Sequence, residues 1–188
     1  MRVVLSSILL LFYSLQENLS PLPLLAAAFC LCLRLLFHMS IPEQGSPAPA
    51  ISLETDSGAP FRLSSLKGQN VVLYFFPKAD TPGCTKESCE FRDTSKKFTA
   101  ANTVIVGVSP DPTRAQAKFK QKFDLPFVLL ADVDHKAAEA YGAWKKKSMY
   151  GKKYLGVERT TFIIDPEGVI KKVFPKVKVE GHAEEVFA

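Results

Sequence analysis

The sequence of 188 residues contains few cysteines, few histidines and no long uninterrupted hydrophobic run. Four cysteines in a chain of this size are too few for a disulfide scaffold. There is no Cys-x-x-Cys pair, and the three histidines, His38, His135 and His182, are scattered along the chain. Zinc sites depend on closely spaced Cys and His ligands, so the sequence predicts no metal.

The charged residues are mixed rather than segregated by sign. The 24 Lys and Arg are interleaved with 19 Asp and Glu, and the formal net charge is +5. This distribution is typical of a solvated surface, and no nucleic-acid-binding motif accompanies it. With 47% hydrophobic residues, the chain is globular and long enough for one domain with a substantial core. We therefore expect no nucleic-acid partner.

Residues 1–38 differ in composition from the rest of the chain. Two apolar runs, Leu5–Leu15 and Leu19–Leu33, are separated by Glu17 and interrupted by prolines. Neither run reaches the length of about 18 residues expected of a spanning helix. Three interpretations remain open for this segment: a start placed too early, a targeting peptide and a membrane anchor.

The first of these three interpretations is favoured, because Met39 and the residues after it form a natural beginning. The domain organisation is then a hydrophobic extension over residues 1–38 and one globular domain over residues 39–188. The expected location is the cytoplasm, with export or organelle targeting as the alternative if the extension is a targeting segment.

The remainder of the chain alternates predicted strands and helices. Val71–Phe76 is almost uniformly apolar and rich in β-branched and aromatic residues, as expected of a strand covered on both faces. A helix is predicted from about Pro82 to Thr99, and a second apolar strand over Thr103–Val108. Strand, helix and strand in this order predict a parallel βαβ unit.

Shorter elements surround this unit. The sequence predicts hairpins around Asp56-Ser57-Gly58 and Pro166-Glu167-Gly168, and a third buried strand over Phe127–Ala131. Helices are predicted over Asp111–Phe123, Asp134–Ala143 and Gly181–Ala188, the last shorter than is usual, which suggests a truncated end. The lysines from Lys145 to Lys153 predict a basic, solvated loop, with an anion site as the alternative. The fold class is α/β, with a central mixed sheet flanked by helices.

Cys84 stands at the predicted start of the helix after the central strand. Thr81 is a candidate cap and Pro82 suits the first helical turn. The unpaired amides and positive dipole of a helix N-terminus favour an anion, and a thiolate is such an anion. Cys84 is therefore a candidate nucleophile, with a buried structural cysteine as the alternative.

The segment from Pro77 to Cys84, Pro-Lys-Ala-Asp-Thr-Pro-Gly-Cys, resembles the Pro-x-x-x-Thr-x-x-Cys signature of peroxiredoxins. Its continuation to Cys89 resembles the bacterioferritin comigratory protein (PrxQ) branch of that family. The resemblance implies a thiol peroxidase on a thioredoxin-like fold, with Cys84 as peroxidatic cysteine and Cys89 as resolving cysteine. It also implies hydrogen peroxide and organic hydroperoxides as substrates, and no cofactor.

The resemblance assigns roles to three further residues. Arg159 begins an Arg-Thr-Thr-Phe run that is similar to the family's active-site arginine strand, although a surface arginine at a strand end is the alternative. A planar guanidinium would favour the thiolate and hold a peroxide oxygen. Thr81 would hydrogen-bond the peroxide unless its hydroxyl only caps the helix, and Pro77 would shield the pocket from water. Thioredoxin is the implied reductant, with glutaredoxin as the alternative.

Cys84 and Cys89 are too far apart for a disulfide in an intact helix. Residues five apart are separated by about 8.6 Å between Cα atoms, whereas a disulfide tolerates at most about 7 Å. The first turns of the helix must then unwind in each catalytic cycle. Because this disulfide would lie within one chain, we expect a monomer.

Three other functions fit parts of the sequence. A disulfide reductase would use a Cys-x-x-Cys pair, which is absent. A redox sensor or chaperone could use a bond between Cys84 and Cys89 as a switch without turnover. The hydrophobic extension alone would fit a membrane-tethered structural protein.

Overall fold

The computed structural model of the protein describes residues 40–149 and 152–188. The expectations for residues 1–38 lie outside the described residues. Within the described part, no helix is both long and apolar enough to cross a membrane.

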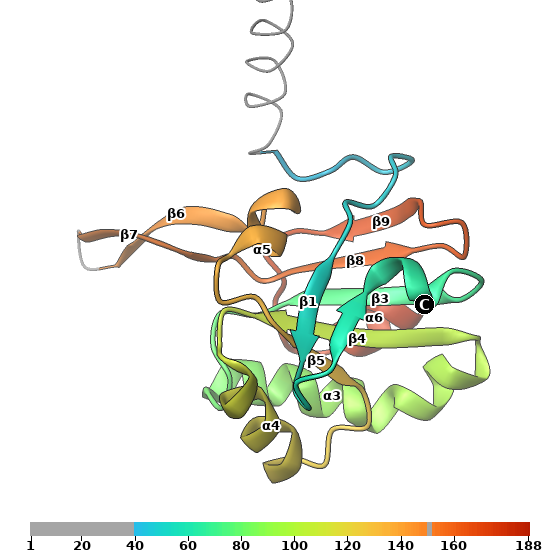
Figure 1. Cartoon of the computed structure of the whole chain (residues 1–188), viewed down its shortest axis with the longest axis horizontal. Coiled ribbons are helices and arrows are strands. Elements are labelled where there is room, and N and C mark those ends of the chain that lie inside the picture. The colour runs from blue at the N-terminus through green and yellow to red at the C-terminus, as the bar shows by residue number, and fades with distance from the viewer. Residues whose placement is uncertain (1–39, 150–151) are drawn as a thin grey trace, which may run out of the picture. The chain divides into compact units, whose positions relative to one another are not determined.

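The described residues form a seven-stranded mixed sheet with helices on both faces (Figure 1). The strand order is β2-β1-β5-β4-β3-β8-β9; β3, β4 and β5 run parallel and the other neighbours are antiparallel. The strands of this sheet are β1 Ser52–Thr55, β2 Pro60–Arg62, β3 Asn70–Phe75, β4 Thr103–Ser109, β5 Val128–Ala131, β8 Thr160–Ile164 and β9 Ile170–Phe174. The helices are η2 Leu63–Leu66, α3 Pro82–Ala100, α4 Thr113–Lys122, α5 Lys136–Ala140 and α6 His182–Phe187. The predicted central mixed sheet flanked by helices is confirmed.

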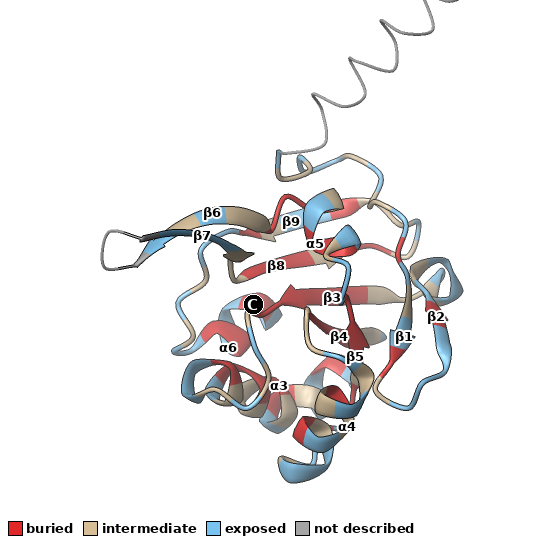
Figure 2. Cartoon of the chain, turned by 60° about the vertical axis from the view of Figure 1, so that its left-hand side comes forward, coloured by how far each residue is buried: buried red, intermediate tan, exposed pale blue. Residues whose placement is uncertain are grey.

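Strand β3 lies in the interior of the sheet and is buried on both faces, as its composition predicts (Figure 2). Val71, Leu73 and Phe75 point to one core cluster, which α5 covers. Val72 and Tyr74 point to the other cluster, which α3, α4 and α6 cover. The strand therefore fixes the position of whatever follows its carboxyl end, because side chains hold it from both sides.

The β3-α3-β4 segment is the predicted parallel βαβ unit. Close packing at its centre depends on Gly107 of β4. A Cβ atom at this position would lie 2.8 Å from the Tyr74 hydroxyl oxygen and 2.7 Å from a Leu129 methyl carbon. Glycine lets the Tyr74 ring lie flat against β4, and the Tyr74 hydroxyl shares a 3.0 Å hydrogen bond with Ser88 Oγ of α3. Strand and helix are thus joined beneath the site described below.

The predicted basic loop over Lys145–Lys153 is wrong. The structure has a separate two-stranded antiparallel hairpin, β6 Trp144–Met149 and β7 Lys152–Val157. Lysine has a low β propensity, so the composition favoured a loop. The backbones of β6 and β7 nevertheless pair with each other, and the lysine side chains can stay in water because the hairpin lies outside the main sheet. Two of the lysines also make defined contacts. Lys145 forms an ion pair with Glu158 at 2.8 Å, and Lys147 donates a hydrogen bond to the Val157 carbonyl at 2.5 Å.

Candidate active site

A tight turn connects the carboxyl end of β3 to α3 and positions the site. Asp80 in this turn has a φ of 56°, a left-handed conformation that Asp tolerates better than most residues. The Ala79 amide donates to Asp111 Oδ2 at 2.7 Å, and the Ser109 hydroxyl donates to the same oxygen at 2.7 Å. Asp111 therefore anchors the turn to the end of β4, a role that the sequence did not reveal.

Thr81 occupies the N-cap position of α3, but its side chain does not cap the helix. The Thr81 carbonyl accepts the first helical hydrogen bond, from the Thr85 amide at 2.8 Å. The Thr81 hydroxyl instead donates to the Lys78 carbonyl at 2.9 Å. The interpretation of this hydroxyl as a helix cap is thus wrong, because the hydroxyl turns back toward the preceding loop. Pro77, half-buried, begins the same loop.

Cys84 is the third residue of α3 and is 1% exposed. Its sulfur belongs to an apolar cluster with Phe76, Tyr74 and Phe91. Because its amide belongs to the first helical turn, the thiol lies beside donors that no helical carbonyl satisfies. Cys84 is thus both buried and at a helix N-terminus, so burial alone does not distinguish a nucleophile from a structural cysteine.

Arg159 reaches this cysteine from the other side of the site. It follows β7 and precedes β8, and its Nη2 donates to Cys84 Sγ at 3.4 Å. The side chain is 15% exposed, so the alternative of a surface arginine is wrong. A Cβ atom at position 83 would lie 3.4 Å from Nη2, in ordinary van der Waals contact, so the guanidinium lies directly over Gly83. The two stretches of sequence, 75 residues apart, meet at one sulfur atom.

Glu87 holds the other side of the guanidinium. Its Oε2 accepts a hydrogen bond from Arg159 Nη1, and its side chain is 1% exposed. The second carboxylate oxygen, Oε1, has no partner among the described residues. The sequence analysis did not select Glu87, although the spacing of three residues from Cys84 places both on one face of the helix.

The acid and the cation modify one another's ionisation. Burial raises the pKa of Glu87 to about 7, and the nearby Glu90 also raises it. Arg159 acts in the opposite direction and lowers the pKa of Glu87, but does not cancel the effect of burial. Burial disfavours the charge on Arg159, but Glu87 and Cys84 more than offset this, so the pKa of Arg159 is raised. The guanidinium is therefore charged at all physiological pH values, whereas Glu87 gains its negative charge as the pH rises through about 7.

Lys147 of the β6–β7 hairpin is a second cation near the site. Its Nζ bonds the carbonyl of Val157, two residues before Arg159. The pKa of Lys147 is lowered from its ordinary value, mainly because the amine is partly buried. Arg159 also lowers this pKa, whereas Glu158 and Cys84 raise it and offset part of the shift. The sequence did not identify Lys147 as a residue near the site, because this stretch was interpreted as a solvated loop. Only the pairing of β6 with β7 places Lys147 near Arg159.

Cys89 lies on the same helix and is partly buried, and both Cys84 and Cys89 are free thiols. Helix α3 runs without interruption from Pro82 to Ala100, through both residues. In such a helix their Cα atoms are about 8.6 Å apart, beyond the limit of about 7 Å for a disulfide. The structure is therefore that of the reduced protein, and a bond between the two requires a different backbone conformation.

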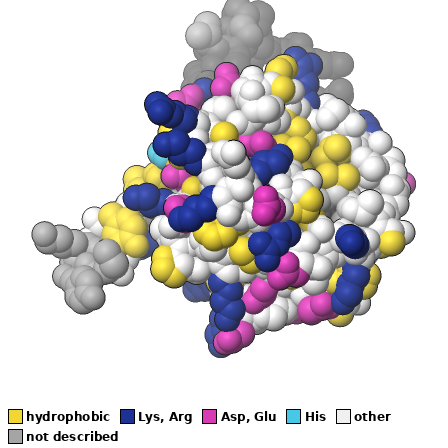
Figure 3. Space-filling model, turned by 90° about the horizontal axis from the view of Figure 1, so that it is seen from below, with side chains coloured by type: hydrophobic (Ala, Val, Ile, Leu, Met, Phe, Trp, Pro, Cys, Tyr) yellow, Lys and Arg dark blue, Asp and Glu magenta, His cyan; other side chains and the backbone are white. Residues whose placement is uncertain are grey.

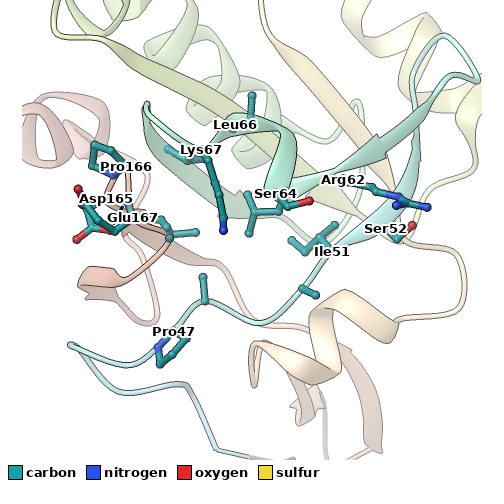
Figure 4. A pocket seen from close by; sticks show the side chains of 16 residues that line it. Pro47, Ile51, Ser52, Arg62, Ser64, Leu66, Lys67, Asp165, Pro166 and Glu167 are labelled. Atoms are coloured by element: carbon teal, nitrogen blue, oxygen red, sulfur yellow. Dashed lines mark hydrogen bonds between the residues drawn. The ribbon is translucent and has the colours of Figure 1, made fainter.

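A separate pocket lies at the opposite end of β3 from Cys84. Its volume is about 360 Å³, and Figure 4 shows side chains from the N-terminal segment, η2 and the β8–β9 turn around it, among them Pro47, Ile51, Lys67 and Asp165. None of the residues predicted for the active site lines this pocket. The described residues also contain no group of three or more side chains that could hold a metal ion.

Comparison with known proteins agrees with this geometry. The family model of the AhpC/TSA family matches residues 44–173. A bcp peroxiredoxin of Coxiella burnetii is 54% identical over 148 residues, which cover 79% of this chain and 97% of the relative. The peroxiredoxin Bcp of Bacillus subtilis is 50% identical, over 76% of this chain and 91% of the relative.

A solved structure of the bacterioferritin comigratory protein of Xanthomonas campestris has a TM-score of 0.70 and 38% identity, and covers 73% of this chain and 87% of that chain. That structure concerns alkyl peroxide reduction by the Xanthomonas protein. The peroxidoxin BcpB of Mycobacterium tuberculosis has a TM-score of 0.69 and 37% identity, over 77% of this chain and 94% of that chain.

A buried thiol at a helix N-terminus beside a guanidinium, on a mixed sheet flanked by helices, defines a thiol-dependent peroxidase of the thioredoxin-like fold. The chain belongs to the AhpC/TSA family and is a peroxiredoxin similar to the Bcp and PrxQ proteins. The resemblance seen in the sequence, and the thioredoxin-like fold that it implied, are both confirmed.

Proposed function

We propose that the protein reduces hydrogen peroxide and organic hydroperoxides through Cys84 and then forms a disulfide with Cys89. The observation that carries this proposal is the 3.4 Å contact between Arg159 Nη2 and the buried Cys84 sulfur at the start of α3. A permanently charged donor at this distance favours the thiolate over the thiol. It also leaves a cation beside the place where a peroxide oxygen must sit.

In the first step the Cys84 thiolate attacks the terminal hydroxyl oxygen of the peroxide. A sulfur–oxygen bond forms and the oxygen–oxygen bond breaks. The departing hydroxide or alkoxide takes from solvent a proton equivalent to the one that the Cys84 thiol released, and leaves as water or alcohol. Arg159 and the first-turn amides of α3 stabilise the negative charge as it moves to the leaving oxygen. The Thr81 hydroxyl, which donates its proton to the Lys78 carbonyl, accepts a hydrogen bond from the peroxide, and Pro77 limits the access of water. Cys84 is left as a sulfenic acid.

In the second step the Cys89 thiol attacks the Cys84 sulfenic sulfur. A disulfide forms and water departs. Because Cys84 and Cys89 lie five residues apart in α3, the helix must open before these sulfurs can meet. The opened helix would also expose the disulfide to a dithiol reductant. We propose thioredoxin as this reductant, with glutaredoxin as the alternative, and a monomer as the active form, since the disulfide stays within one chain.

The range of substrates follows from the surroundings of the sulfur. Phe76 and Phe91 lie in the apolar cluster that contains Cys84. Both rings are fully buried in the reduced protein, so they give the sulfur apolar surroundings rather than an open surface, and these surroundings suit an organic hydroperoxide as well as hydrogen peroxide. The Xanthomonas relative, which reduces alkyl peroxides, supports this range. The family match over residues 44–173 supports placing the catalytic domain within residues 39–188.

The opening of α3 predicts a change in hydrogen exchange. In oxidised protein, amides over residues 84–91 should exchange faster than in reduced protein, by about tenfold or more, because unwinding exposes their hydrogen bonds. Amides of β3 serve as the control, since that strand stays covered on both faces. Mass spectrometry of peptic fragments measures both regions. Equal protection of residues 84–91 in the two states would contradict the proposed cycle.

The complete cycle is tested by peroxide consumption coupled to NADPH oxidation through thioredoxin reductase and thioredoxin. Wild-type protein should turn over continuously. Cys89→Ser should form the sulfenic acid at a rate within about twofold of wild type and then stall unless an external thiol is added. A redox sensor or chaperone would form the disulfide without sustained NADPH oxidation, so a wild-type protein that stops after one equivalent of peroxide would exclude the enzyme.

A further inference from the structure

The β6–β7 hairpin has an unusual charge composition. Residues 144–157 contain five lysines and no Asp or Glu. The hairpin extends away from the main sheet (Figures 1 and 2), and no strand of that sheet pairs with it. A positively charged element that projects from the body is available for contact with a partner.

The register of the hairpin places its exposed residues on defined faces. Directly opposite residues of an antiparallel pair share a face. Lys146 is opposite Leu155, and Ser148 is opposite Lys153, so these four residues lie on the same face. Leu155 is 53% exposed and both lysines are exposed. This cationic face, defined by Lys146, Ser148, Lys153 and Leu155, thus carries an exposed leucine between two lysines.

The positive charge of the cationic face is not neutralised by neighbouring acids. On the same hairpin, Lys145 pairs with Glu158, and on α3 Lys86 pairs with Glu180. In the part of the chain that the structure describes, no carboxylate forms an ion pair with Lys146 or Lys153. Figure 3 shows that Lys and Arg alternate with Asp and Glu over other parts of the surface. An anionic partner would therefore meet the lysines of this face without displacing an internal partner.

We propose that the cationic face binds the anionic surface of a lipid membrane. The lysines would contact acidic headgroups, and Leu155 would enter the boundary between headgroups and acyl chains. The phosphates of a nucleic acid could also bind the lysines. A nucleic acid would not bury the exposed leucine, however, because proteins bind nucleic acids mainly through phosphate contacts and through stacking of bases on aromatic side chains. The pairing of an exposed aliphatic side chain with uncompensated cations is what favours lipid.

The position of the hairpin gives such binding a consequence for the enzyme. Strand β7 ends at Val157, two residues before the active-site Arg159. A hairpin held on a membrane would keep the peroxidase site close to the lipid surface. The binding itself requires no peroxidase chemistry, so it can be tested independently of the proposed function.

The test is cosedimentation of full-length protein with vesicles. Vesicles of phosphatidylcholine with about 30% phosphatidylserine are compared with vesicles of phosphatidylcholine alone. The hairpin variant carries Lys146→Gln, Lys153→Gln and Leu155→Ser. The control carries Lys96→Gln, Lys118→Gln and Val133→Ser, which remove the same charge and an apolar side chain of equal exposure, since Val133 is also 53% exposed.

Wild type should prefer the anionic vesicles. Each lysine near an anionic surface contributes about a fivefold factor, so the loss of two lysines should lower partitioning to anionic vesicles by roughly 25-fold, and the loss of Leu155 should lower it further. The control should change by less than about threefold, and high salt should remove most of the difference between the two variants. Equal partitioning of the hairpin and control variants would overturn the proposal. Residues 1–38 do not affect this comparison, because both variants contain them. A wild-type protein without preference for anionic lipid would also overturn the proposal.

Discussion

Cys84→Ser is expected to lower peroxide consumption by at least about three orders of magnitude. A serine hydroxyl is almost fully protonated at neutral pH and is a much weaker nucleophile than cysteine sulfur, and the neighbouring Arg159 does not change this. An alkoxide, moreover, would give no sulfenic acid from which to continue. Serine is nearly the same size as cysteine, so the cluster around Phe76 and Phe91 should stay packed. The measurement is the initial rate of NADPH oxidation in the coupled assay.

Cys89→Ser is the matched control for Cys84→Ser, because it makes the same atomic change in the same helix, at a site that is only partly buried. It should keep the first oxidation step, detected by a sulfenic-acid reagent and mass spectrometry, while Cys84→Ser should give no such product. If Cys84→Ser consumed peroxide at the wild-type rate, the nucleophile would be another group, and the contact between Arg159 and Cys84 would be structural.

Local sequence was sufficient for the elements around the site because each carries a strong local signal. The strand that ends at Phe75 is apolar on both faces, and Pro82 suits only the first turn of a helix. Together these signals locate Cys84 at a helix N-terminus. Arg159 has no comparable local signal, since an arginine before a strand is usually exposed. It was assigned only through resemblance to a family motif, and the structure places it at the cysteine.

The residues that the sequence did not reveal depend on contacts distant in the chain. Glu87 is a glutamate on a helix, ordinarily an exposed residue, and is held at the site only because Arg159, from the segment between β7 and β8, pairs with it. Asp111 likewise matters because its carboxylate spans from β4 to the turn at Ala79. The lysines of β6 and β7 oppose strand formation by propensity, so only backbone pairing shows the hairpin. In each case tertiary geometry decides a role that composition leaves undetermined.

Arg159→Gln is expected to lower the second-order rate constant for oxidation of Cys84 by about 100-fold to 1,000-fold, the range for losing one donor to a developing charge. Glutamine keeps some length and polarity but has no charge to favour the thiolate. The substitution also leaves the Glu87 carboxyl buried without its cation, so the pKa of Glu87 rises above the value of about 7 that it has beside Arg159. Stopped-flow oxidation by hydrogen peroxide measures the rate constant.

Arg159→Lys separates the charge of the guanidinium from its geometry. Lysine retains a cation but has no planar fork that can contact Glu87 and Cys84 together, so its rate constant should fall between those of Arg159→Gln and wild type. Arg114→Gln, an exposed arginine of α4, is the control for loss of charge alone and should match wild type. A wild-type rate constant for Arg159→Gln would mean that the guanidinium does not act on Cys84 during oxidation, and that Arg159 only holds Glu87 in place.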